Sequence, residues 1–137
     1  MSDQSQTQST GQKKILLIDD DTFLLDMYSL KFTKAGYEVK IANSTDLGLK
    51  ILRDGYVPNV MLVDIVMPGM DGLDMVNMVR KERLSPSTTV IMLTNQGASD
   101  DIARAQKVNV DGYIVKATTI PSEVLVEVEK ICNNKKS

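Results

Sequence analysis

The stretch from Val60 to Gly72 constrains the fold of this 137-residue chain more than any other. It reads Val-Met-Leu-Val-Asp-Ile-Val-Met-Pro-Gly-Met-Asp-Gly, so four apolar residues lead directly into Asp64 and then into a loop that contains Pro68. An unbroken apolar run ended by turn residues is typical of a strand that is buried on both faces of a parallel sheet. The carboxyl ends of such strands form the edge at which open α/β sheets bind their ligands. We therefore expect Asp64 at that edge, where a buried carboxylate needs a cation or a hydrogen-bond donor.

Short apolar runs and amphipathic segments alternate five times along the chain. Strands are predicted at residues 15–18, 37–42, 60–63, 88–93 and 113–115. Helices are predicted at about 22–35, 73–84 and 98–108. Another helix is predicted to begin after an N-cap at Asn43 or Ser44, and the last helix is predicted to begin near Pro121. This alternation predicts a doubly wound (βα)5 α/β fold, in which one five-stranded parallel sheet carries helices on both faces.

The first predicted helix shows how its ends and its buried face are assigned from sequence. Asp21 directly precedes the helix and is a favoured N-cap residue, and Gly36 directly follows it as a favoured C-cap. Its apolar residues at helical spacing, which we expect to face the core, are Phe23, Leu24, Met27 and Leu30.

The composition narrows the possible classes of function. A formal net charge of −2 provides no strong basic field for nucleic acid or for a membrane surface. The chain has no histidine, which excludes imidazole catalysis and histidine-based metal sites, and its single Cys132 excludes an internal disulfide. No apolar run approaches the roughly 20 residues of a membrane span, and the N-terminus does not resemble a signal peptide. We expect a cytoplasmic protein with a disordered tail at 1–12, one domain at 13–133 and a short tail at 134–137.

Polar side chains that can do chemistry follow four of the five predicted strands. Asp19 and Asp20 follow the first strand, Asp64 follows the third, Thr94 the fourth and Lys116 the fifth. Because the carboxyl ends of parallel strands share one edge, three carboxylates, a hydroxyl and an ammonium should meet there. Oxygen ligands select a hard cation such as Mg²⁺, and a carboxylate can attack a phosphoryl group to give an aspartyl phosphate. Asp64 is the best candidate nucleophile, since it alone follows a central apolar strand without a neighbouring acid.

These motifs, in this order and spacing, closely resemble the receiver domain of two-component response regulators. The resemblance covers about residues 13–133, and its matching segments are Ile-Leu-Leu-Ile-Asp-Asp-Asp, Val-Asp-Ile-Val-Met-Pro-Gly-Met-Asp-Gly, Val-Ile-Met-Leu-Thr and Asp-Gly-Tyr-Ile-Val-Lys. It implies a flavodoxin-like fold with strand order 2-1-3-4-5. It also implies that Asp64 accepts a phosphoryl group from a sensor histidine kinase or a phosphotransfer protein. Asp19 and Asp20 would then hold Mg²⁺ together with Asp64 and the backbone carbonyl of Val66.

The resemblance further implies how a phosphoryl group would be sensed. Thr94 would hydrogen-bond one phosphoryl oxygen, Lys116 would pair with another, and Tyr113 would change rotamer as Thr94 moves. The surface formed by residues 98–108, 113–115 and the last helix would then change and be read by a downstream protein, or would form a homodimer. Such a domain is a regulatory phosphoacceptor and not an enzyme with turnover, and the chain is either a single-domain regulator or the receiver part of a longer one.

Two positions near the predicted phosphoryl site depart from the family pattern. Ala117 follows Lys116 where receivers usually have a proline with a cis bond, and a non-proline cis bond costs about 2.5–4 kcal/mol. We therefore predict a trans bond there, or a strained cis bond held by the site. Asn95 follows Thr94 where the family favours alanine or glycine, so its side chain would either narrow access to Asp64 or add a contact to the phosphate.

Val66 is the third departure, and it leads to a kinetic hypothesis. It lies two residues beyond Asp64, beside the expected path of the water that hydrolyses the aspartyl phosphate. An apolar branched side chain cannot orient water, so we predict a long-lived phosphoryl group.

Three other functions remain as alternatives. An aspartyl-phosphate phosphatase would usually have a second aspartate at position 66, which here is valine. A flavodoxin-like nucleotide or flavin binder would need a phosphate loop after the first strand, where Asp19-Asp20-Asp21 would repel a phosphate. A degenerate receiver would use the fold for protein contact without phosphorylation, which Asn95 and Ala117 keep open.

Overall fold

The computed structural model describes residues 12–95, 99–116 and 119–135. Its single sheet has five parallel strands in the order β2-β1-β3-β4-β5, which confirms the predicted fold and strand order. The strands are β1 (Lys14–Ile18), β2 (Glu38–Ala42), β3 (Val60–Asp64), β4 (Thr89–Thr94) and β5 (Gly112–Val115). The helices are α1 (Thr22–Lys34), α2 (Thr45–Arg53), α3 (Gly72–Lys81), α4 (Ser99–Lys107) and α5 (Pro121–Lys135).

The predictions made for the chain ends and for the Lys116–Ala117 bond fall largely outside the described residues. Residues 1–11 of the predicted tail, Ala117 and the last two residues belong to this undescribed part. The last helix continues to Lys135, past the domain boundary that we expected at residue 133. Within residues 12–95, 99–116 and 119–135, no helix combines the length and apolar character that crossing a membrane requires.

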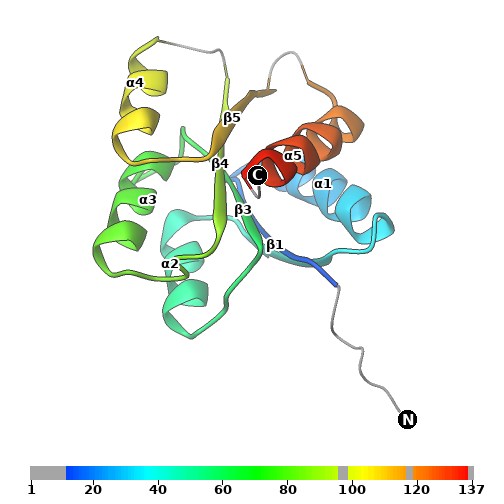
Figure 1. Ribbon diagram of the computed structural model, residues 1–137, viewed down its shortest axis with the longest axis horizontal. Helices are drawn as coiled ribbons and strands as arrows, with labels where there is room; N and C mark the ends of the chain where they lie inside the picture. Colours follow the sequence, from blue (N-terminus) through cyan, green and yellow to red (C-terminus); the bar gives the residue numbers. More distant parts are fainter. Residues whose placement is uncertain (1–11, 96–98, 117–118, 136–137) are drawn as a thin grey trace.

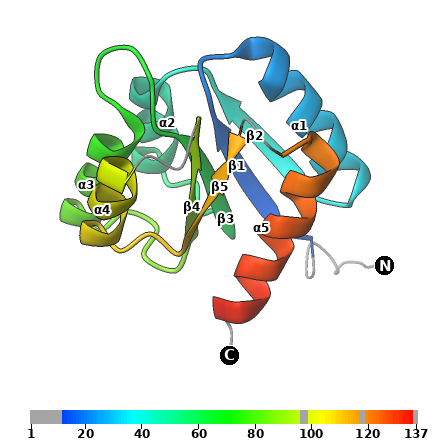
Figure 2. The same cartoon turned by 90° about the horizontal axis from the view of Figure 1, so that it is seen from above.

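Helices cover both faces of the sheet, as Figures 1 and 2 show. α1 and α5 lie on one face, and α2, α3 and α4 lie on the other. Successive residues of the central strand β3 alternate between the two cores, so Leu62 packs with α1 and α5 whereas Met61 packs with the other three helices. All five residues of β3 are buried, which is why its sequence is a continuous apolar run.

The predicted buried face of α1 is wrong at two of its four residues, since Leu24 packs against the core and Met27 is half-buried. Phe23 and Leu30 are 71% and 57% exposed, and the residues that α1 buries are Leu25, Tyr28 and Phe32. Apolar residues occur around most of this helix, so their spacing alone could not identify the side that faces the sheet. The aromatic residues decide it, because the ring of Phe32 packs edge-on against Tyr37 at a centroid distance of 5.1 Å.

Side-chain caps fix where the helices begin. Asp21 caps α1 by accepting from the backbone N–H of Leu24 at 3.2 Å, as predicted, and Ser44 caps α2 in the same way. Asp71 caps α3, which begins one residue earlier than predicted, at Gly72. α3 also ends earlier than predicted, because the chain turns at Arg83, whose φ is 56°.

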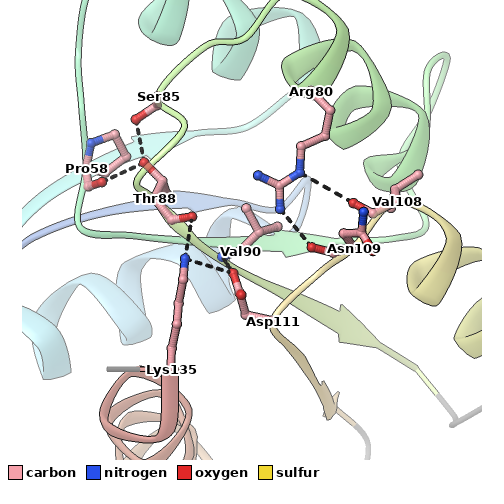
Figure 3. A network of polar contacts seen from close by, with 9 residues as sticks. All are labelled: Pro58, Arg80, Ser85, Thr88, Val90, Val108, Asn109, Asp111 and Lys135. Atoms are coloured by element: carbon pink, nitrogen blue, oxygen red, sulfur yellow. Dashed lines mark hydrogen bonds and ion pairs between the residues drawn. The ribbon is translucent and has the colours of Figure 1, made fainter. Parts of the chain in front are cut away.

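A network of polar contacts holds the amino-terminal edge of the sheet, which is opposite the edge that carries Asp64 (Figure 3). The Asp111 carboxylate accepts from the backbone N–H of Val90 at 2.7 Å, and Lys135 donates to the Thr88 carbonyl at 3.2 Å. Lys135 also lies 3.4 Å from Asp111, so the last turn of α5 is tied to the starts of β4 and β5. These contacts position β5 without involving the opposite edge, where the candidate site lies.

Candidate functional site

The strand order brings the predicted site residues to neighbouring strand ends. Asp64 is the last residue of β3 and Thr94 is the last residue of β4, while Asp19 and Lys116 directly follow β1 and β5. β3 lies between β1 and β4 in the sheet, so Asp64 is central and the other three side chains extend from strands on either side. The carboxyl edge of the sheet is therefore the place where the predicted residues meet.

Three carboxylates form a compact cluster at this edge. One oxygen from each of Asp19, Asp20 and Asp64 lies within 4.8 Å of the others. Asp19 and Asp64 are almost fully buried, at 1% and 2% exposure, and Asp20 is exposed. Asp19 is held in place by the backbone N–H of Asp21, which donates to its Oδ1 at 2.9 Å. A set of hard oxygen ligands from three carboxylates, two buried and one open to solvent, fits a hydrated divalent cation such as Mg²⁺.

Lys116 supplies the positive charge beside this cluster. Its Nζ lies 3.1 Å from Oδ2 of Asp64 and 3.0 Å from Oδ2 of Asp19, and its side chain is only 12% exposed. The contact with Asp64 follows from the sequence pattern, but the contact with Asp19 was not predicted. No sequence signal could have predicted the contact between Lys116 and Asp19, because both Asp19 and Asp64 lie at strand ends. Only the position of β1 beside β3 in the sheet brings Asp19 within reach of Lys116.

The protonation equilibria of this cluster are perturbed in opposite ways by burial and by charge. Burial, followed by the negative charge of Asp19, raises the pKa of Asp64 to about 6, although the ammonium of Lys116 lowers it in part. Burial opposes the charge of Lys116, but its hydrogen bonds and its attraction to Asp19 and Asp64 outweigh this effect and raise its pKa. Asp64 is therefore a carboxylate whose charge is not fully compensated by its protein neighbours.

Three buried side-chain oxygens at this edge lack a hydrogen-bond partner among the described residues: Oδ2 of Asp19, Oδ1 of Asp64 and Oγ1 of Thr94. Oδ2 of Asp19 has the ammonium of Lys116 at 3.0 Å as an ion-pair partner, whereas Oδ1 of Asp64 and Oγ1 of Thr94 belong to residues that are 2% exposed and have no such partner. Buried polar atoms are nearly always hydrogen-bonded in folded proteins, so these two oxygens are candidates for contact with an ion, a water molecule or a ligand. An acceptor and a donor on neighbouring strand ends are available to a cation and to an anionic oxygen, respectively.

Gly72 supports the site in a way that the sequence reading missed. The helix predicted at 73–84 leaves Gly72 in the preceding loop, but Gly72 begins α3 and its N–H donates to the Ile65 carbonyl at 2.9 Å. A Cβ atom at Gly72 would lie 2.1 Å from the backbone oxygen of Asp64, so no larger residue fits without displacing Asp64. The glycine at the first position of a helix, where a better helix former is usual, was the available signal.

The other predicted residues lie around the cluster. Val66 is 58% exposed in the loop after β3, and Asn95 is exposed directly after Thr94. Tyr113 lies on β5 and is 38% exposed, with its side chain lining a surface groove between β5 and α5. The structure thus places these three residues at the rim of the site and on the adjoining surface, and their roles remain predictions.

Comparison with known proteins identifies the type of domain. A family model described as the response regulator receiver domain matches residues 15–128. The chain is 28% identical over 119 residues to the phosphate regulon transcriptional regulatory protein PhoB of Pseudomonas aeruginosa, an alignment that covers 87% of this chain and 51% of that protein. It is 31% identical over 120 residues to the probable transcriptional regulator ycf27 of Porphyra purpurea, with 88% and 47% covered. The chain spans about half the length of these regulators.

Solved structures with the same fold cover almost the whole described chain. The CheY-like response regulator receiver domain protein of Methanospirillum hungatei has a TM-score of 0.82 at 28% identity, with 92% of this chain and 98% of that chain covered. The chemotaxis response regulator CheY4 of Vibrio cholerae has a TM-score of 0.80 at 27% identity, with 88% and 98% covered. Both neighbours therefore correspond to this chain over nearly their full length.

Proposed function

The chain belongs to the response regulator receiver domain family, and from this premise we propose that it is a phosphorylation-controlled switch in which Asp64 is the phosphoacceptor. The observation that carries the proposal is the environment of Asp64. One carboxylate oxygen contacts Lys116 at 3.1 Å, and the other is buried without a hydrogen-bond partner among the described residues. A receiver domain is a regulatory domain, so the proposed role is to accept one phosphoryl group and not to turn over a substrate.

The proposed transfer needs little covalent help from the protein. A carboxylate oxygen of Asp64 forms a bond to phosphorus while the phosphorus–nitrogen bond of a donor phosphohistidine breaks. The electron pair of that bond leaves with the imidazole nitrogen, and the product on Asp64 is an acyl phosphate. Lys116 would pair with one phosphoryl oxygen. The Thr94 hydroxyl, which has no hydrogen-bond partner among the described residues, would donate to another. The donor in the cell would be a sensor histidine kinase or a phosphotransfer protein.

The residues present fit a magnesium site. Asp19, Asp20 and Asp64 would hold the ion, together with the backbone carbonyl of Val66, because hard oxygen ligands in this number suit Mg²⁺ and the chain has no histidine. When bound, the ion would supply positive charge that neutralises the developing charge of the transferred group. Asp19 and Asp20 would orient the ion, and Lys116 would be free to turn from Asp19 towards the phosphoryl group.

The proposed output is by protein contact. Thr94 and Tyr113 lie on the adjacent strands β4 and β5, so movement of Thr94 towards a phosphoryl oxygen would change the space available to Tyr113. The surface of α4, β5 and α5 would then present a different shape to a downstream protein. Either a single-domain regulator or the receiver part of a longer regulator would work in this way, and a degenerate receiver would use the same surface without phosphorylation.

Intact mass measurement tests the proposal most directly. The native chain and the Asp64→Asn variant are incubated with a small acyl phosphate, with and without Mg²⁺. We expect the native chain alone to gain the mass of one phosphoryl group, only with Mg²⁺, and to lose it in base. A gain in the variant would place the acceptor elsewhere, and no gain in the native chain would favour the degenerate receiver. Turnover of added phosphoesters would favour the phosphatase alternative.

A further inference from the structure

A partly enclosed cavity of about 340 Å³ lies at the amino-terminal edge of the sheet, opposite the edge that carries Asp64. Segments far apart in the sequence line it, and they include Lys13 before β1, Tyr37 before β2, Pro58 and Asn59 before β3, Ser87 before β4 and Lys135 at the end of α5. Figure 3 shows two of these residues, Pro58 and Lys135, at this edge. The volume lies within the range of about 300–1,000 Å³ that is usual for small-molecule sites. None of the described residues that line the cavity belongs to the phosphoryl site, so a ligand there would serve a separate role.

Apolar side chains form much of the cavity lining. Pro58 and Val60 are buried, and Val57 is 52% exposed although it belongs to neither core of the domain. Tyr37 is buried, and burial followed by the charge of Glu129 raises the pKa of Tyr37 to about 12, so its phenol stays neutral. Exposed apolar side chains that line a concave surface are typical of a binding site. The cavity therefore suits a ligand with an apolar body.

The charged side chains that line the cavity are cationic. Among the described residues they are Lys13 and Lys135. Lys135 donates to the Thr88 carbonyl at 3.2 Å and to Asp111 at 3.4 Å, so one of its three N–H donors is still available. Lys13 forms no ion pair within the part of the chain that the structure describes, although Glu129 and Lys13 both line a neighbouring hollow. The charge of Lys13 therefore has no direct counter-charge there.

Asn59 adds an oriented neutral donor to this cavity. The backbone N–H of Lys14 donates to Oδ1 of Asn59 at 2.7 Å, which fixes the orientation of the side-chain amide. The amide nitrogen then carries two N–H donors, and neither has an acceptor within residues 12–95, 99–116 and 119–135. No acidic side chain from these residues lines the cavity. The cavity therefore presents ammonium and amide donors beside apolar walls, which is the complement of an anion with an apolar body.

We propose that this cavity binds a small amphipathic anion, a carboxylate carried on an apolar ring system. The carboxylate would accept from Lys13 and Asn59, and the rings would pack against Tyr37 and Val57. A cationic ligand would meet two like charges, and a neutral one would leave the ammonium groups without a counter-charge. The inference goes beyond the proposed function and does not depend on it, because the cavity and the phosphoryl site lie at opposite edges of the sheet.

Three naphthalene probes that differ only in charge test the proposal. They are 2-naphthoate, the neutral 2-naphthamide and the cationic 2-naphthylmethylammonium. Each is titrated into the isotope-labelled native chain without divalent ions, and binding is followed by the chemical shifts of the backbone amides. We expect 2-naphthoate to shift the amides of residues 59–60, 87–89 and 132–135. The neutral probe should shift the same amides at lower affinity, and the cationic probe should not bind.

Matched variants separate the cavity from general electrostatics. Lys13→Gln should weaken 2-naphthoate binding by roughly twofold to fivefold and leave 2-naphthamide binding unchanged. Val57→Asp should weaken 2-naphthoate binding by roughly fivefold or more, because it removes an apolar contact and adds a like charge. Lys81→Gln on α3 and Val126→Asp on α5 make the same changes at exposed positions outside the cavity, and Val126 has the same 52% exposure as Val57. Both controls should bind 2-naphthoate like the native chain.

Equal affinities for the three probes would overturn the proposal, and so would equal weakening by the cavity variants and the controls. Amide shifts confined to residues around Asp64 would overturn it as well, because the probe would then bind at the opposite edge. Intact mass after treatment with a small acyl phosphate keeps this inference apart from the proposed function. Lys13→Gln and Val57→Asp should be phosphorylated like the native chain, and a failure of phosphorylation in all of them would leave the outcome of the probe titrations unchanged.

Discussion

The ammonium nitrogen of Lys116 lies 3.0 Å from Oδ2 of Asp19, as close as it lies to Asp64. Lys116 is therefore the shared counter-charge of two buried carboxylates at the carboxyl ends of the adjacent strands β1 and β3. A divalent cation at the same carboxylates would compete with it for Asp19. Metal binding would therefore shift the position of Lys116, which is the residue proposed to pair with the phosphoryl group.

Replacing Lys116 by methionine should destabilise the protein and increase its response to Mg²⁺. The substitution keeps a long apolar stem but leaves the charges of Asp19 and Asp64 uncompensated, and removing one partner of a buried ion pair costs several kcal/mol. Because the Lys116 side chain is 12% exposed and the two carboxylates can be partly rehydrated in its absence, we expect a loss of about 2–3 kcal/mol at pH 7.5 without divalent ions. Millimolar Mg²⁺ should recover more stability in this variant than in the native chain, as measured by urea denaturation.

Lys130→Met is the control for this prediction. Lys130 and Glu127 form an exposed pair at 3.6 Å, so its loss should change the stability by less than about 1 kcal/mol and should not alter the effect of Mg²⁺. An identical gain from Mg²⁺ in the native chain and in Lys116→Met would show that the lysine and the metal do not share these carboxylates.

Asp64→Asn should stabilise the protein at neutral pH. Burial and Asp19 raise the pKa of Asp64 to about 6, above the usual 3.8, so the folded state holds its proton more tightly than the unfolded state. The stability of the native chain should therefore fall as the pH rises from about 4 to about 6, and the variant lacks this loss. Above pH 7 the variant should be more stable by about 2 kcal/mol in the presence of a chelator.

Thermal or urea denaturation between pH 4 and pH 8 checks this prediction. The difference between variant and native chain should be small near pH 4, grow through pH 6 and then level off. Mg²⁺ should reduce the difference at pH 8, because the metal neutralises the charge that the variant removes. A constant difference over this range would mean that Asp64 does not titrate as its surroundings imply.

The sequence predicted which residues meet at the site better than it predicted how they are held. The strand ends of a parallel sheet share one edge by topology, so the polar residues at the carboxyl ends of β1, β3, β4 and β5 had to meet there. The contact between Lys116 and Asp19 depends on side-chain reach across the sheet, which no local pattern encodes. The buried face of α1 was also predicted only in part, because Phe23 and Leu30 are as apolar as the residues that the helix buries.

Gly72→Ala should destabilise the protein and distort the site around Asp64, whereas a glycine-to-alanine change at a position with free space around it should not distort the site. The new Cβ would lie 2.1 Å from the Asp64 carbonyl oxygen, so either α3 or the end of β3 must move. Overpacking of this kind costs about 1–3 kcal/mol or more, and the displacement should also slow phosphorylation of Asp64. Gly36→Ala is the control, since its added Cβ meets nothing within 4 Å and only the φ of +97° costs about 1 kcal/mol. Equal stability losses, with unchanged phosphorylation in both variants, would contradict the packing argument.

Val66→Asn should shorten the lifetime of the phosphoryl group on Asp64. Val66 is 58% exposed in the loop after β3, so the substitution should not disturb the core, and the asparagine amide can both donate to and accept from an attacking water. Positioning a water molecule in this way typically contributes on the order of tenfold or more to a hydrolysis rate. Mass spectrometry after removal of the phosphodonor gives the lifetime directly, and Val57→Asn, at a similarly exposed valine elsewhere, controls for a change in surface polarity. Loss of phosphate from the native chain within seconds, or equal lifetimes in all three proteins, would show that Val66 does not protect the acyl phosphate from water.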